Sequence, residues 1–69
     1  MATHVFQLKF REFTEARKFA RSLNLKNRKE WDEWCAENMF SKPKDIPVVP
    51  NVAYKNHGWK NYSDWLGVP

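Results

Sequence analysis

Seven basic side chains lie between residues 11 and 29, and they are the groups best suited to contact an anion. They are Arg11, Arg17, Lys18, Arg21, Lys26, Arg28 and Lys29. Fixed cations displace counterions from a nucleic-acid backbone, which makes phosphate binding favourable and dependent on salt. Arg17 and Arg21 are one helical turn apart and Lys18 lies beside both. We therefore predict that these residues form a surface that contacts DNA.

The same cations have two structural alternatives. Glu12 and Glu15 are near enough in sequence to partner a basic face that is only solvated. Arg17 is also placed to join the two ends of the chain through an ion pair with Asp64. In both cases the side chains would serve the fold and would not contact a phosphate backbone.

Residues that support catalysis are few and scattered. Cys35 is the single cysteine, so an internal disulfide cannot form. A cysteine nucleophile needs a nearby base, but His4 and His57 both fall in segments expected to be non-helical. One cysteine and two separated histidines have no metal-ligand spacing, and two glycines are too few for a phosphate-binding loop. We expect a chain that is not an enzyme, with no metal, cofactor or small-molecule substrate, and with Cys35 as a buried structural thiol.

The elements that position these groups are predicted to be helices. Apolar side chains recur at helical spacing over Phe13–Leu23 and Asn27–Met39, and a short third helix is expected over Tyr62–Leu66. Asn24 and Gly67 follow the first and third helices, and both residue types tolerate the left-handed conformation that ends a helix. The predicted fold is a small all-α domain.

The helix starts carry capping signals of different strength. Asn27 and Asn61 are predicted N-caps, with Glu30 and Asp64 three residues later. Glu30 can return a hydrogen bond to Asn27 in a capping box. Glu12 precedes the first helix without the usual Ser or Thr oxygen, so we expect that helix to be less well capped.

The segments outside the helices are expected to be extended. Residues 1–10 alternate apolar and polar side chains late in their course and predict an extended N-terminal arm, followed by one helical domain over residues 11–69. Ser41–Ala53 contains three prolines, and a residue before proline avoids the helical region. We predict a proline-rich extended connector whose apolar residues pack on the helices, namely Ile46, Val48, Val49 and Val52.

A chain of 69 residues allows one domain, and its core must be dense because small domains bury little surface. Aromatic residues make up 16% of the chain, including four tryptophans. Exposed indoles would stack on unpaired bases, but helical spacing favours an inward orientation for all four. They are Trp31, Trp34, Trp59 and Trp65.

The charge balance favours an anionic partner. Twelve Lys and Arg against eight Asp and Glu leave a net charge of +4. The first ten residues lack the apolar core of a signal peptide, and the longest apolar run, Ile46–Pro50, is too short to cross a bilayer. A cytoplasmic location with no membrane partner is expected.

An ordered series of short motifs runs through residues 13–67. It consists of Phe13-x-x-Ala16-Arg17-x-Phe19-x-Arg21-Ser22-Leu23-x-Leu25, Trp31, Lys42-Pro43-x-Asp45-Ile46-Pro47, Pro50, Tyr54, Gly58-Trp59 and Asp64-Trp65-Leu66-Gly67. This series resembles the repeat unit found in the N-terminal parts of some phage-type integrases and in tandem arrays in other large proteins. Asn24 departs from the family pattern, which often has Gly there, and Glu12 replaces the common Ser or Thr cap.

The resemblance implies a phage-derived, non-catalytic accessory module that assists DNA binding in DNA integration or recombination. In such integrases the catalytic domain lies in a separate, later segment, so neither Tyr54 nor Tyr62 is given its role. The implied partners are DNA, bound weakly and without sequence preference, and neighbouring repeats or an integrase catalytic domain. The alternative from another class is a structural or protein-interaction repeat that packs on neighbouring modules.

Overall fold

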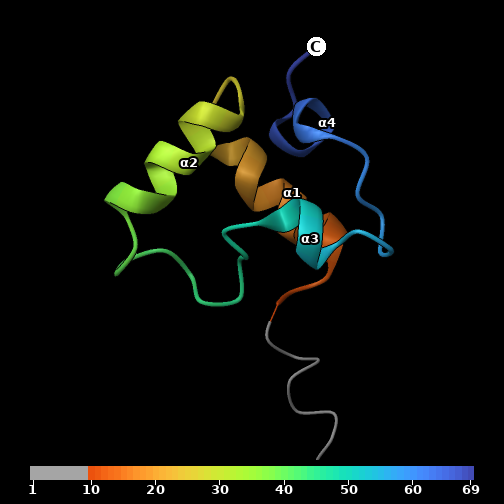
Figure 1. Cartoon of the computed structure of the whole chain (residues 1–69), viewed down its shortest axis with the longest axis horizontal. Helices are drawn as coiled ribbons and strands as arrows, with labels where there is room; N and C mark the ends of the chain where they lie inside the picture. The colour runs from red at the N-terminus through yellow and green to blue at the C-terminus, as the bar shows by residue number, and fades with distance from the viewer. Residues whose placement is uncertain (1–9) are drawn as a thin grey trace, which may run out of the picture.

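The computed structural model describes residues 10–69 and contains four helices. They are α1 (Phe13–Ser22), α2 (Arg28–Glu37), α3 (Pro50–Ala53) and α4 (Tyr62–Leu66) (Figure 1). Within residues 10–69 there is no strand, so the described part is a small all-α domain, as the apolar periodicity predicts. The arm predicted for residues 1–10 lies, apart from Phe10, outside the described residues.

Helices α1, α2 and α4 begin and end close to the residues predicted from the sequence. α4 has the predicted bounds, whereas α1 stops one residue early and α2 begins after its cap and ends at Glu37. Asn24 has a φ of 58° and Gly67 a φ of 75°, which confirms the left-handed conformation expected after α1 and α4.

Both predicted N-cap hydrogen bonds are present, but the predicted return bond from Glu30 is not. Asn27 Oδ1 accepts from the backbone N–H of Glu30 at 2.9 Å, and Asn61 Oδ1 accepts from that of Asp64 at 2.7 Å. The carboxylate of Glu30 reaches one residue beyond Asn27 and accepts from the N–H of Lys26 at 2.8 Å, so the predicted return bond to Asn27 is wrong. Glu12 provides no side-chain cap to α1, as expected.

The connector differs from its prediction in three ways. Turns and bends occupy most of residues 41–49, where an extended chain is predicted; the backbone N–H of Ile46, for example, donates to the Pro43 carbonyl at 3.2 Å. Its last residues form α3, because Pro50 occupies the first turn of the helix, where a missing N–H costs nothing. Only part of its apolar set packs inward: Ile46 and Pro50 are fully buried, whereas Val48 and Val49 are nearly half exposed and Val52 is 68% exposed. At Val48 the backbone carbonyl faces the core and accepts from Trp31 Nε1 at 3.0 Å, leaving the side chain in solvent.

The core is a cluster of side chains from α1, α2, α4, the connector and the residue that follows α3. Its buried hydrophobic members are Phe13, Ala16, Ala20, Trp31, Cys35, Ile46, Tyr54, Trp65 and Leu66. Trp31 and Trp65 are completely buried and meet edge to face at 5.5 Å between ring centroids. Trp34 and Trp59 are half-buried and pack against the cluster, so the inward orientation of the tryptophans is confirmed.

Trp65 lies at the centre of this cluster. Besides Trp31, its ring contacts Phe13, Tyr54 and Trp59, with centroid distances between 5.8 and 6.0 Å. These partners belong to α1, α2 and the segment between α3 and α4, and α4 itself packs on α1. Burying Trp65 therefore joins α1, α2 and α4 to the segment that follows α3.

Candidate nucleic-acid interface

Arg11 is held by the connector. Its Nη2 donates to Asp45 Oδ1 at 2.8 Å and its Nε to Asp45 Oδ2 at 2.9 Å, so the guanidinium and the carboxylate form a bidentate ion pair. The backbone N–H of Arg11 donates to the Asp45 carbonyl at 2.9 Å, and the Tyr54 hydroxyl donates to the Arg11 carbonyl at 2.6 Å. Arg11 thus joins the start of α1 to the connector.

Arg17 and Arg21 are both held by Asp64 of α4. Arg17 Nη1 lies 2.9 Å from Asp64 Oδ2, and its guanidinium lies 5.1 Å above the ring of Phe13. Arg21 Nη2 donates to the Asp64 carbonyl at 2.7 Å and approaches the carboxylate at 3.3 Å. The Arg17–Asp64 ion pair, one of the two structural alternatives from the sequence, is therefore present.

The other four predicted cations are exposed, although the Arg28 guanidinium also lies 5.2 Å from the centre of the Tyr62 ring. The nitrogens of Lys18, Arg28 and Lys29 lie 3.6 to 3.9 Å from the carboxylates of Glu15, Asp32 and Glu33, each one turn away on its own helix. Such exposed pairs contribute little and are readily exchanged for another anion. Lys26 is exposed in the turn before α2 and makes no ion pair within residues 10–69.

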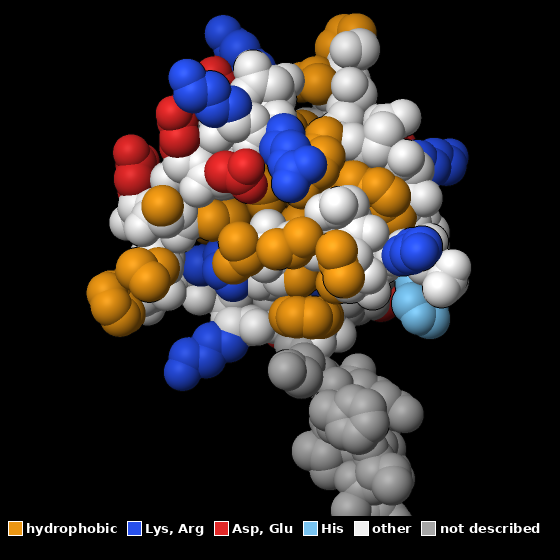
Figure 2. Space-filling view, in the orientation of Figure 1, with side chains coloured by type: hydrophobic (Ala, Val, Ile, Leu, Met, Phe, Trp, Pro, Cys, Tyr) orange, Lys and Arg blue, Asp and Glu red, His pale blue; other side chains and the backbone are white. Residues whose placement is uncertain are grey.

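The structure therefore divides the seven predicted residues into two groups. Arg11, Arg17 and Arg21 join distant parts of the chain, with partners 34 to 47 residues away. The outward group, which we call the corner cations, lies from the end of α1 to the start of α2 and consists of Lys18, Lys26, Arg28 and Lys29. Figure 2 shows Lys and Arg side chains interspersed with acidic ones in this upper part of the molecule.

The sequence prediction missed a second basic segment. Residues 42–60 contain four lysines and one acid, Asp45, which is already paired with Arg11. Lys44, Lys55 and Lys60 are exposed, whereas the Lys42 ammonium donates to the carbonyls of Pro43 and Ile46. Counting charge segment by segment, instead of looking for cations at helical spacing, would have found this surface.

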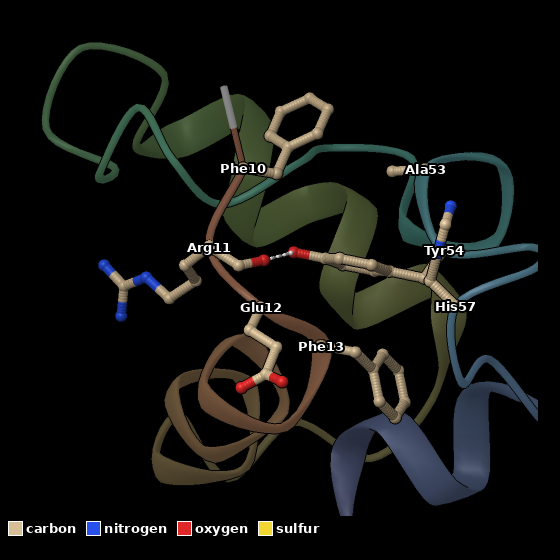
Figure 3. A pocket seen from close by; sticks show the side chains of 7 residues that line it. All are labelled: Phe10, Arg11, Glu12, Phe13, Ala53, Tyr54 and His57. Carbon is tan, nitrogen blue, oxygen red and sulfur yellow. Dashed lines mark hydrogen bonds between the residues drawn. The ribbon is translucent and has the colours of Figure 1, made fainter. Parts of the chain in front are cut away.

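Two adjoining hollows lie along the connector. One is an open cleft of about 710 Å³ lined by Phe10, Phe13, Tyr54 and His57 among others. Figure 3 shows the ring of Tyr54 across the cleft from Phe10, while the Arg11 guanidinium points away from it. The other is a shallower groove of about 280 Å³ between Phe10 and the exposed valines, and the two hollows share Phe10 and Ala53.

Cys35 is buried, as predicted. Removal of its thiol from water raises the pKa of Cys35 to about 11, so the reactive thiolate is scarce at neutral pH. Among residues 10–69, no three His, Cys, Asp or Glu side chains gather into a metal-binding group. In the same part of the chain, no helix has the length and apolar character needed to cross a membrane.

The Arg11–Asp45 pair should make stability depend on pH. Hydrogen bonds from the Arg11 guanidinium lower the pKa of Asp45 below its ordinary value. A lowered folded-state pKa adds stability above the unfolded pKa, about 3.9, and this contribution disappears as the pH falls through the folded-state pKa. Urea unfolding should show Asp45→Asn to be less stable than wild type at pH 7, with the difference shrinking below about pH 4. A difference that stays constant down to pH 2 would contradict this role for the pair.

Comparison with family models, curated proteins and solved structures finds no match to this chain. The likeness to an integrase repeat unit therefore rests on the motif series itself. Several of its motif residues have a structural role. Arg17 and Asp64 form an ion pair, Trp31 and Trp65 pack against each other in the core, and Gly67 ends α4.

Proposed function

We propose that this chain is a non-catalytic accessory module, similar to an integrase repeat unit, that assists DNA binding through phosphate contacts. The corner cations make those contacts. They hold a strand of phosphates without reading base identity, since a phosphate backbone carries no sequence information. Affinity of one copy is weak, and neighbouring repeats or an attached catalytic domain would raise it through effective concentration.

The observation that carries this proposal is the availability of the corner cations. The side chains of Lys18 and Lys29 are 77% and 83% exposed, and their ion pairs are longer than 3.5 Å. A phosphate can therefore replace the carboxylate partner at little cost. Arg17, by contrast, would have to leave a partly buried pair with Asp64 before it could bind DNA.

An alternative function is that of a protein-interaction repeat that packs on neighbouring modules. The observation in its favour is the exposed apolar surface of Val48, Val49 and Val52 with Phe10. Apolar side chains in a contiguous exposed patch are typical of a surface that meets another protein. The two functions use different residues, so one chain is able to perform both.

The DNA proposal is tested with two triple variants of equal charge change. Lys18→Gln, Lys26→Gln and Lys29→Gln together should weaken binding to a mixed-sequence duplex at least about tenfold in low salt, because each lost phosphate contact removes released counterions. The control is Lys44→Gln, Lys55→Gln and Lys60→Gln, which should weaken it less than about threefold. Fluorescence anisotropy measures both, and circular dichroism checks that each variant is folded.

Equal losses in the two triple variants would show that net charge alone drives the binding and would refute the assignment to the corner cations. Absence of binding by the wild-type chain at about 50 mM salt would remove the DNA function itself.

A further inference from the structure

The connector exposes an apolar strip that the fold does not use. It consists of the exposed Phe10, Val48, Val49 and Val52 together with the half-buried Ala53 and the buried Pro47, and these residues line the shallower groove. Figure 2 shows a band of hydrophobic side chains across the middle of the molecule, where the connector and α3 lie in Figure 1. Val52 is apolar, yet 68% of it is exposed to water. Covering it with a partner protein would remove this apolar surface from water, which is favourable.

The strip continues into a longer depression. The adjoining cleft shares Phe10 and Ala53 with it and adds the rings of Phe13 and Tyr54. The cleft is also lined by Arg11, Glu12 and His57. Its apolar part, together with the strip, accommodates the apolar face of an amphipathic helix, whose anchors repeat every three or four residues.

Exposed lysines flank the strip along the chain, and the one carboxylate lining the adjoining cleft is that of Glu12. Lys44 lies before it in the chain and Lys55 after it, and both are exposed. The one acidic residue between them, Asp45, is engaged by Arg11. Figure 2 shows basic side chains near both ends of the hydrophobic band. A partner that carries carboxylates beside its apolar anchors would therefore match both the shape and the charge of this surface.

We propose that the apolar strip docks an acidic amphipathic helix from a partner protein. The inference rests on the protein-interaction function proposed above and names the chemistry of the partner. The apolar face of the helix covers Val48, Val49 and Val52, and its flanking Glu or Asp side chains pair with Lys44 and Lys55. A second copy of the chain fits less well, because a symmetric contact brings the same lysines of both copies together.

The probe is a fluorescein-labelled peptide of about 18 residues, long enough to form a helix, with leucine on one face and glutamate on the other. Anisotropy titrations of the full chain should give a Kd of about 10–100 µM, the affinity of a small transient contact. Val52→Asp should weaken binding at least about fivefold by placing a like charge against the peptide. Phe40→Ser is its matched control, since Phe40 is 95% exposed but lies outside the strip, and it should leave the Kd unchanged.

Charge variants test the second half of the proposal without altering the apolar strip. Lys44→Gln with Lys55→Gln should weaken peptide binding about threefold to tenfold, whereas Lys18→Gln with Lys29→Gln should not. A peptide with lysine in place of glutamate should not bind. Failure of the acidic peptide to bind, equal binding of the basic peptide, or indifference to both Val52→Asp and the Lys44–Lys55 double variant would each overturn the proposal.

Self-association separates this failure from failure of the interaction function. If the chain dimerises in sedimentation velocity, and Val52→Asp abolishes the dimer while the acidic peptide does not bind, the strip is an interface between copies and the inferred partner is wrong. If neither the peptide binds nor a dimer forms, both the inference and the protein-interaction function are refuted.

Discussion

Trp65→Ala should leave the domain largely unfolded at 37 °C. The indole is completely buried and contacts four aromatic rings from separate parts of the fold. Truncating a buried tryptophan costs about 3–5 kcal/mol, because apolar burial is lost and a cavity remains. A domain this small has little stability to spare. The melting temperature, followed by circular dichroism, should fall by at least about 15 °C.

Two further variants serve as controls for this prediction. Phe40→Ala removes an aromatic ring of which 95% is exposed, and its free energy of unfolding should stay within about 0.5 kcal/mol of wild type. Trp65→Phe should cost less than Trp65→Ala, in part because Trp65 Nε1 has no hydrogen-bond partner within residues 10–69. A loss below about 1 kcal/mol for Trp65→Ala would mean that the indole does not join the elements as described.

Gly58→Ala should be strongly destabilising although it adds only a methyl group. Gly58 has a φ of 113°, which side-chain-bearing residues rarely adopt, and an added Cβ would lie 2.7 Å from the ring of Phe13. That ring is itself buried in the core and cannot move without disturbing its neighbours. Backbone strain and the clash together should cost about 2–4 kcal/mol of the free energy of unfolding, measured by urea denaturation.

Gly67→Ala provides the comparison for this prediction. Gly67 has a φ of 75°, close to the left-handed region that other residues can enter at a cost of about 1 kcal/mol. The atoms nearest to its added Cβ, at 2.9 to 3.1 Å, belong to the half-exposed side chain of Arg21, which can shift more easily than the buried ring of Phe13. The loss at Gly67 should therefore be smaller than the loss at Gly58, and the reverse order would contradict the packing of Gly58 against Phe13.

Those parts of the fold that depend on neighbouring residues could be predicted from the sequence. The caps at Asn27 and Asn61 and the left-handed end at Gly67 need only the residues within one turn. Trp31 and Trp65 could be assigned to the core because helical spacing places them on apolar faces. Each of these features is encoded locally and does not depend on how the helices cross.

The parts that depend on tertiary packing could not be predicted in the same way. Asp45 reaches Arg11 across 34 residues, and no period in the sequence marks that contact. Val52 has the same apolar chemistry as Ile46, yet Ile46 is buried and Val52 is exposed, because the turn into α3 gives them different directions. From the sequence, the ion pair between Arg17 and Asp64 can be predicted only as an alternative, since a cation on a helix can contact solvent or the rest of the fold equally well.

The salt dependence of DNA binding tests most directly whether Arg11, Arg17 and Arg21 stay bound to Asp45 and Asp64 and do not contact phosphates. Each phosphate contact contributes about −0.9 to the slope of log K against log salt concentration, so the four corner cations predict a slope no steeper than about −3.6. If Arg11, Arg17 and Arg21 also bound phosphates, the slope would approach about −6. We expect the shallower value for the wild-type chain on a mixed-sequence duplex. A slope near −6 would show that the arginines leave their carboxylates for DNA and would contradict this account.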